Sequence, residues 1–331
     1  MTSLKDAVRT YAGRHANEDG LALTPMSDLR MMCVDTPGGV MHSVYRPLIC
    51  LVLQGAKRIV VGTEDETFSA GQAVIVSADM PVAGRIVRAS PAEPYIAVAI
   101  ELDMSLIREL SAEMDERLLQ QPPQEGTLFV EDTGAALLGC IERLMRLIDR
   151  PQAAPLLKPG IMKELHYWLL AGPHGGALVN NARRDSRVGR LAPAITLLRS
   201  EFRSKLPIAR LAEAVAMSPT AFHKHFKAVT SLTPTQYQKR LRLIEARRLM
   251  REKGLTASMA AFEVGYESSS HFTRDYGRLF NAPPKRDALK ARGSTSATLG
   301  PGAEDPFPAP SRIAPVIRDR STAGRRESER A

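Results

Sequence analysis

Apolar residues change their spacing along this 331-residue chain, and the changes divide the chain into regions. Residues 4–16 place apolar side chains about one helical turn apart, which predicts a short amphipathic helix. Between residues 29 and 101, short Val- and Ile-rich runs are separated by Gly, Pro and Asp. This texture predicts a compact antiparallel sandwich or barrel rather than alternating β and α units. The four clearest runs are residues 48–53, 58–61, 73–76 and 95–100.

From residue 104 to residue 171 the apolar spacing becomes helical. Pro159-Gly160 is expected to interrupt the pattern before a further helix over Ile161–Leu170. These helices either form a dimer surface or pack within the chain, and the pattern does not decide between the two. Residues 172–190 have the Gly- and Arg-rich composition of a linker. The Pro, Gly, Ser and mixed charges of 293–331 predict a disordered tail.

Residues 208–289 contain nearly the same pattern twice, with the second copy 50 residues after the first. Upstream of the turn the offset is 49, so the second turn holds one extra residue, within Gly265–Glu267. Two copies are too few for a solenoid, and they predict a duplicated unit of helix, tight turn and helix. The residues that match are Ser218 and Ser268, Phe222 and Phe272, Phe226 and Tyr276, and Pro234 and Pro284.

In each copy, a serine is the natural N-cap of the second helix and aromatic residues form its buried stripe. Short hydroxyl residues and cations remain on the outer face near the helix N-terminus, which suits insertion into a DNA major groove. The alternative is a helical bundle with an ordinary solvated surface, but the duplication and the matched outer faces favour nucleic acid. The predicted base-reading residues are Thr220, His223, Lys224, Ser269, Ser270, Thr273 and Arg274. The predicted phosphate contacts are Ser218, Lys227, Arg240, Ser268, Lys285 and Arg286.

A helix is predicted between the copies, from Pro234 to about Glu252, because Thr233 and Gln236 form a capping box with proline at N1. At ~1.5 Å per residue it is about 27 Å long, enough to hold two recognition helices about one DNA turn apart. Its arginines either contact phosphates or form a solvated face, and both possibilities stay open. They are Arg240, Arg242, Arg247 and Arg248.

Charge is unevenly placed along the chain. Residues 1–180 hold 16 Lys and Arg against 22 Asp and Glu, whereas residues 190–292 hold 20 against 8, a net charge of +12. This predicts that only the second half meets a polyanion. The 3 cysteines, without a C-x-x-C motif, predict no disulfide framework and no cysteine zinc site, in keeping with the cytoplasm. No signal peptide and no apolar run of about 18 residues is present, so neither secretion nor membrane spanning is expected.

Residues ~190–290 resemble the DNA-binding domain of the AraC family of bacterial transcription regulators. The matching motifs are A212-xx-VAMSP, L243-IEARRLM and A261-FEVGYESSSHFTRDYGRLF. In that family the N-terminal parts of both recognition helices read bases, which implies this role for the seven residues named above. Ala216 and Ser231 stand where the family usually has glycine, and Asp287 stands where an aromatic residue is common. Ala216 is therefore expected to be strained if its φ is positive.

Residues ~25–170 resemble the cupin-like β-barrel with trailing helices found in one branch of that family. The motifs are Y45-RPLICLVLQGAKRIVVG, F68-SAGQAVIVSADMPVAGRI and P94-YIAVAIELD. Only His42 lies in the barrel region and 78–84 has no histidine, so neither a metal nor another cofactor is expected. A small-molecule pocket is the default for such a barrel. Its candidate polar residues, each expected more often at the surface, are Arg46, Gln54, Lys57, Arg58 and Arg85.

These observations predict an α+β protein of two domains, with a β-barrel domain at 1–171, a linker at 172–190 and a double helix-turn-helix domain at 191–292. The expected function is sequence-specific binding of double-stranded promoter DNA by a cytoplasmic regulator, an activator that contacts RNA polymerase. Control is expected through a small-molecule effector or homodimerisation. No hydrolase, NTPase or dinucleotide motif points to an enzyme. The alternatives are a cupin-type metalloenzyme with a DNA-binding appendage and a nucleic-acid binder without sequence preference.

Overall fold

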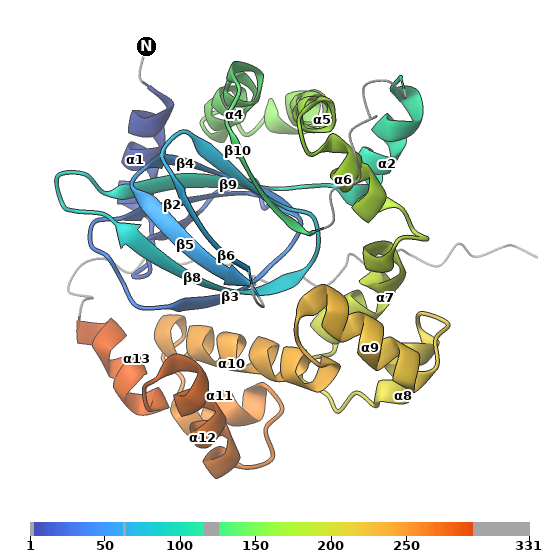
Figure 1. Cartoon of the computed structure of the whole chain (residues 1–331). Coiled ribbons are helices and arrows are strands. Elements are labelled where there is room, and N and C mark those ends of the chain that lie inside the picture. Colours follow the sequence, from blue (N-terminus) through green and yellow to red (C-terminus); the bar gives the residue numbers. More distant parts are fainter. Residues whose placement is uncertain (1–2, 62–63, 116–125, 294–331) are drawn as a thin grey trace, which may run out of the picture.

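The Val- and Ile-rich runs form two antiparallel sheets in the computed structural model, which describes residues 3–61, 64–115 and 126–293 (Figure 1). The strands are β1 Leu21–Leu23, β2 Leu29–Val34, β3 Met41–Tyr45, β4 Leu48–Gln54, β5 Ala56–Val61, β6 Glu64–Ser69, β7 Gln72–Val76, β8 Met80–Arg88, β9 Tyr95–Glu101 and β10 Leu128–Asp132. One sheet has the order β1-β2-β9-β4-β7-β10 and the other the order β3-β8-β5-β6. The predicted antiparallel barrel or sandwich is confirmed.

The two sheets enclose one apolar core, and helices cover the other face of the six-stranded sheet. Strands β4 and β9 are buried along nearly their whole length, because both of their faces are covered. By contrast, β5 alternates, with Arg58 and Val60 exposed and Ile59 and Val61 buried. Together the barrel core and the helical layer make a first domain.

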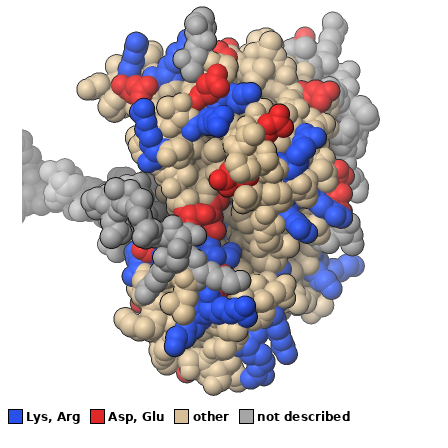
Figure 2. Space-filling view, turned by 90° about the vertical axis from the view of Figure 1, so that its left-hand side faces the viewer, with Lys and Arg blue, Asp and Glu red and all other residues tan. Residues whose placement is uncertain are grey.

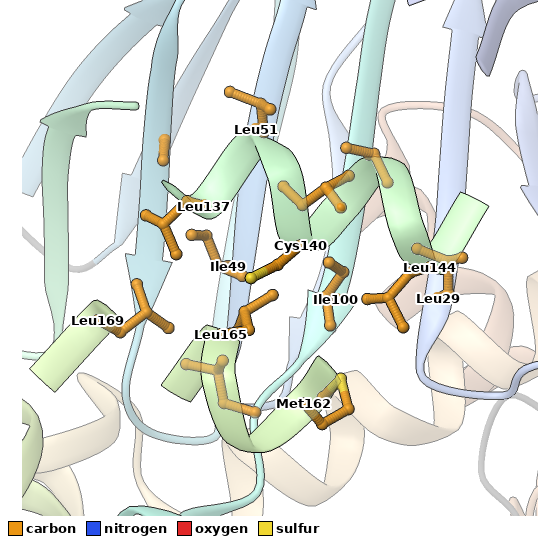
Figure 3. Close-up of a cluster of buried hydrophobic side chains, with 14 of the residues drawn as sticks. Leu29, Ile49, Leu51, Ile100, Leu137, Cys140, Leu144, Met162, Leu165 and Leu169 are labelled. Atoms are coloured by element: carbon orange, nitrogen blue, oxygen red, sulfur yellow. The ribbon is translucent and has the colours of Figure 1, made fainter. Parts of the chain in front are cut away.

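The helices of the first domain are α1 Leu4–His15, α2 Met104–Glu113, α4 Ala135–Ile148, α5 Ala154–Ala171 and α6 Gly175–Ala182. Figure 3 shows how α4 and α5 pack on the sheet, with Cys140 and Leu165 meeting Ile49 and Ile100. The apolar face of α4 that the sequence predicted is buried in this layer. The first domain therefore has two stacked cores, one inside the barrel and one beneath the helices.

Three predictions for this region are wrong in detail. Strand β10 lies inside the segment predicted as helical, where Phe129 and Val130 pair with β7. Helix α5 continues through Pro159 instead of breaking there, because Ile161, Met162 and Leu165 fix the helix on the core while Pro159 faces solvent. The predicted linker contains α6, whose Leu178 is fully buried in the helical layer, so only residues 183–186 join the domains.

The second domain is entirely helical. Its helices are α7 Arg187–Ser200, α8 Ile208–Glu213, α9 Pro219–Thr230, α10 Pro234–Glu252, α11 Ala257–Glu263, α12 Ser269–Phe280 and α13 Pro284–Gly293. Helix α10 begins at the predicted capping box and runs between the two helix pairs (Figure 1). Apolar residues from all the helices between α7 and α12 form one core. All but the first residue of the predicted tail, 293–331, lies outside the described residues.

The two domains touch along α10, which lies beneath strand β3 (Figure 1). Arg199 on α7 forms an ion pair with Asp79, and Arg251 at the end of α10 contacts Asp19 at 2.6 Å. The ring of His42 on β3 meets the ring of Phe280 edge-on, with 5.8 Å between centroids. Each domain therefore contacts the other through both charged and aromatic groups.

Candidate nucleic-acid interface

The first helix pair consists of α8 and α9. Ser218 caps α9, since its side chain accepts a hydrogen bond from the backbone N–H of Ala221 at 3.3 Å, and Pro219 occupies the first turn. Phe222 and Phe226 are fully buried against the core. The opposite face is exposed to solvent, and it carries Thr220, His223, Lys224 and Lys227. This face therefore offers hydroxyl, imidazole and ammonium groups to a ligand.

The second pair, α11 and α12, repeats this design. Ser268 caps α12 by accepting from the backbone N–H of His271 at 3.4 Å, and the rings of Phe272 and Tyr276 are buried. The Thr273 hydroxyl donates to the Ser269 carbonyl oxygen at 2.8 Å, which leaves its lone pairs outward. The exposed face carries Ser269, Ser270, Thr273 and Arg274. All seven predicted base-reading residues thus lie on exposed faces of α9 and α12.

The two turns differ in how they reach a positive φ. Gly265 has φ 85°, and a Cβ built there would lie 1.8 Å from the carbonyl oxygen of Arg203. In the first copy Ala216 has φ 51° in an exposed turn. Ala216 is therefore strained as the sequence predicted, because a left-handed conformation is unfavourable for a residue with a Cβ. Ser231 and Asn281 are also left-handed, and they end α9 and α12 at matching positions.

The six predicted phosphate residues have different environments. Lys227, Lys285 and Arg286 are exposed, and the hydroxyl oxygens of Ser218 and Ser268 accept the helix-cap hydrogen bonds, which does not use their O–H donors. Arg240 is half-buried, and burial lowers its pKa. It lies close enough to His42 that its charge, after burial, lowers the pKa of that imidazole. Arg240 is thus at the junction with the first domain and not on the exposed face that carries Lys227.

Arg242 on α10 has a role that the sequence did not reveal. Its guanidinium donates to four backbone carbonyl oxygens: Phe202 at 2.6 Å, Gly265 at 2.8 Å, Ser204 at 2.9 Å and Arg203 at 3.2 Å. Phe202, Arg203 and Ser204 lie in the loop between α7 and α8, and Gly265 lies in the turn of the second helix pair. One side chain therefore ties the two helix pairs to the connecting helix.

The contacts of Asp287 on α13 explain why the chain has an acidic residue at this position, where the family commonly has an aromatic residue. Its carboxylate is buried and accepts hydrogen bonds from Tyr276 at 2.5 Å, Arg247 at 2.8 Å and Arg251 at 3.1 Å. Burial raises the pKa of Asp287, but these partners more than offset it, so the net shift is downward. Arg248 similarly binds the fully buried Glu245 at 2.8 Å. Arg242, Arg247 and Arg248 are therefore structural, and neither role considered from the sequence describes them.

The surface of the second domain is strongly cationic in places. Figure 2 shows Lys and Arg gathered on the lower part of one face, over the helical domain, with few acidic side chains among them. The net charge of +12 over residues 190–292 is carried in part by exposed cations, among them Lys224, Lys227, Arg274, Lys285 and Arg286. Such a surface attracts a polyanion at long range, before any specific contact forms.

Comparisons with known proteins agree with this geometry. The family model for the AraC-type transcriptional regulator N-terminus matches residues 25–177, and a helix-turn-helix domain model matches residues 211–288. The chain belongs to the AraC family. The sequence of this AraC-family chain is 30% identical over 159 residues to the HTH-type transcriptional activator RhaS of Salmonella schwarzengrund (strain CVM19633), covering 46% of the chain and 54% of RhaS. RhaS of Escherichia coli (strain SE11) is 32% identical over 108 residues, which cover 33% of this chain and 38% of RhaS.

The chain thus spans about half the length, or less, of the curated relatives that it matches. A solved structure with the same two-domain fold is ToxT from Vibrio cholerae O395 bound to (E)-4-(8-methylnaphthalen-1-yl)but-3-enoic acid. It superposes with a TM-score of 0.56 at 11% identity, covering 80% of this chain and 98% of ToxT. Unsaturated fatty acid bound wild-type ToxT from Vibrio cholerae strain SCE256 superposes with a TM-score of 0.56 at 10% identity. The match covers 86% of this chain and 100% of that ToxT chain. These likenesses confirm the fold class of this AraC-family chain.

The AraC-type barrel places its five candidate polar residues differently. Arg58 and Arg85 are exposed, Gln54 is half-buried and donates to the Pro94 carbonyl oxygen at 2.9 Å, and Arg46 is half-buried. Lys57 alone is buried, with its ammonium donating to the Tyr45 hydroxyl at 2.9 Å. Burial lowers the pKa of Lys57, but Tyr45 and Cys50 more than offset this effect. The described residues contain no group of three potential metal-ligating side chains.

One carboxylate of this AraC-type domain is held in an unusual state. Glu131 on β10 lies 3.9 Å from the His174 imidazole, and burial raises the pKa of Glu131 to about 7. The pKa of His174 is lowered, also by burial.

Among the described helices, none is long and apolar enough to cross a membrane.

Proposed function

We propose that this chain is a sequence-specific, DNA-binding transcription regulator whose helices α9 and α12 enter successive segments of a major groove. The observation that carries the proposal is the duplicated, serine-capped helix with an exposed face of hydroxyl and cationic residues, set in a basic domain. Helix α10 has 19 residues and is about 28 Å long at ~1.5 Å per residue. With the width of the flanking pairs it suits a separation of about one DNA turn, ~34 Å.

Positive regulation is the direction we infer, acting in the cytoplasm on promoter DNA and through contact with RNA polymerase. The curated relatives that support this direction are named as activators. Control by a small molecule is the second part of the proposal. ToxT, which has the same fold, is described as bound to an unsaturated fatty acid. The chain performs this role by binding and needs no catalytic step.

We also infer that the first domain self-associates through the start of α5. Leu156 is 82% exposed and Leu157 is 55% exposed, side by side on the first turn of that helix. Adjacent exposed leucines favour a protein contact over solvent. Sedimentation of the full chain is expected to show a dimer that Leu156→Glu converts to a monomer. A monomer before the substitution, or a dimer after it, contradicts this assignment.

Selection of DNA from a random pool by the full chain tests the main proposal. We expect enrichment of an asymmetric site with two boxes about 10 bp apart. The double variant Lys224→Glu with Arg274→Glu is expected to lose this enrichment, because both recognition faces then repel DNA. Arg146→Glu, on α4 of the first domain, is the matched control and is expected to keep it. Absence of any enriched sequence would refute specific recognition.

A further inference from the structure

Two large apolar side chains are exposed on α11, the helix that packs against the second recognition helix (Figure 1). Met259 is 58% exposed and Phe262 is 59% exposed. They are three residues apart in the helix, so they share one face. Glu263 is exposed on the same side, and Glu267 is exposed in the turn before α12. We call these four residues the α11 face, which combines apolar surface with two negative charges.

The first copy of the repeat shows that the fold does not require apolar residues at these positions. The offset of 49 matches Met259 with Arg210 and Phe262 with Glu213. Both charged residues are exposed on α8, where Arg210 pairs with Glu201 at 2.5 Å. The same position in the fold is therefore charged and solvated in one copy and apolar in the other. Adjacent exposed apolar residues that the fold does not need indicate a surface that another segment covers.

The last part of the chain contains a segment with the matching chemistry. Residues 312–320, which we call the tail segment, lie outside the described residues, but their sequence combines apolar residues with an excess of arginine. The apolar residues are Ile313, Val316 and Ile317, and the charged residues are Arg312, Arg318, Asp319 and Arg320. The net charge of the tail segment is therefore +2, which balances the two carboxylates of the α11 face.

The covalent link brings the tail segment within reach of the α11 face. The described part of the chain ends at residue 293 on α13, and α11 and α13 both pack against α10 and α12. The 19 residues from there to residue 312 span at most about 63 Å at ~3.3 Å per residue, more than twice the length of α10. Such a tether gives the tail segment an effective concentration on the order of 1 mM, so an affinity in the same range is enough to hold it.

We propose that the tail segment docks on the α11 face of its own chain. Its apolar residues would cover Met259 and Phe262, and its arginines would pair with Glu263 and Glu267. Burial of apolar area supplies most of the attraction, because exposed ion pairs contribute orientation more than energy. Docking would keep other proteins away from this side of the second helix pair. That consequence rests on the proposed function, whereas the docking itself does not.

Photo-crosslinking in the full chain without DNA tests the docking. p-Benzoylphenylalanine replaces Phe262 in one sample and Glu213, the matching residue of the first copy, in the control. Both positions are exposed, so neither replacement disturbs the core. An equal mixture of isotope-labelled and unlabelled chains shows whether a crosslink lies within one chain. We expect the probe on α11 to crosslink to residues 313–318 of its own chain, which trypsin cuts out after Arg312 and Arg318, and the probe on α8 to give no such crosslink.

Two variants of residues 294–331 make the test specific. The double variant Ile313→Glu with Ile317→Glu should lower the yield of this crosslink by roughly tenfold or more, because the burial of two apolar side chains is lost. Leu299→Glu, outside the tail segment, is the matched control and should leave the yield unchanged. The proposal is overturned by a crosslink between two chains, a crosslink to another part of the chain, no crosslink, or a yield that the double variant does not change. None of these results bears on DNA recognition, because no DNA is present.

Discussion

The two turns of the repeat form a matched pair for testing how the second helix pair is held. Gly265→Ala introduces a Cβ at a φ of 85°, 1.8 Å from the Arg203 carbonyl oxygen and 2.8 Å from its carbon. The left-handed conformation alone costs about 1–2 kcal/mol for a residue with a Cβ. The contact is with backbone that Arg242 also binds, so no side-chain rotation relieves it. We expect a total loss of roughly 3 kcal/mol or more.

Ala216→Gly makes the opposite change at the matching turn. It removes strain of about 1–2 kcal/mol at φ 51°, but it adds about 0.4–1 kcal/mol of unfolded-state entropy cost. The net effect is a gain of stability between ~0 and ~1.6 kcal/mol. The two substitutions should therefore move the free energy of unfolding in opposite directions.

Urea unfolding followed by circular dichroism measures both changes in the full chain. The single tryptophan, Trp168, lies on α5 in the first domain, so its fluorescence reports that domain separately. Gly265→Ala should shift the helical transition and leave the fluorescence transition nearly in place. Small and equal effects of Gly265→Ala and Ala216→Gly would refute the close approach of the second turn to the loop at Arg203.

Three further predictions concern single side chains. In Arg242→Lys one ammonium cannot satisfy four carbonyl oxygens, so the free energy of unfolding, measured by heat or urea, should fall by about 2–3 kcal/mol. The same variant should bind a two-box DNA site less tightly, with a larger loss than for a single box. Arg274→Ala should relax preference at particular base pairs by ~1–3 kcal/mol, whereas Lys227→Ala should weaken all sequences alike; equal losses across sequences for both variants would remove the distinction between them. Because the folded-state pKa of Glu131 is raised to about 7, the stability it contributes is present below pH ~4.5 and is lost as pH rises to about 7. The difference in unfolding free energy between the unmodified chain and Glu131→Gln should fall over that window by up to roughly 3 kcal/mol, and a pH-independent difference would contradict the shift.

Local signals in the sequence predicted much of the second domain. The capping serines, the capping box at Thr233 and the aromatic stripes depend on neighbours within one or two turns, so spacing alone located α9, α10 and α12. Ala216 could be identified as strained, because a family pattern of glycine implies a positive φ. The exposed faces of both helices followed from the same periodicity.

The contacts made by the arginines of α10 could not be predicted in this way. Arg242 and Arg247 are alike in sequence, yet one binds carbonyl oxygens 23 and 40 residues away and the other binds a carboxylate on α13. Those partners become neighbours only through tertiary packing. Helix α6 was missed for a similar reason, because its short apolar run around Leu178 is stabilised by the core of the first domain. Glycine-rich composition described the chain there, but burial determined its structure.

Binding of the full chain to DNA whose two boxes are moved relative to each other tests the central claim most directly. An insertion of 5 bp between the boxes turns one to the opposite side of the helix, because about 10.5 bp make one turn. If α9 and α12 read the two boxes as one rigid unit, the insertion should lower the affinity to that of a single box. Mutation of either box at the original spacing should lower the affinity by the same amount. An affinity unchanged by the insertion would show that the helices do not read successive segments of one groove face.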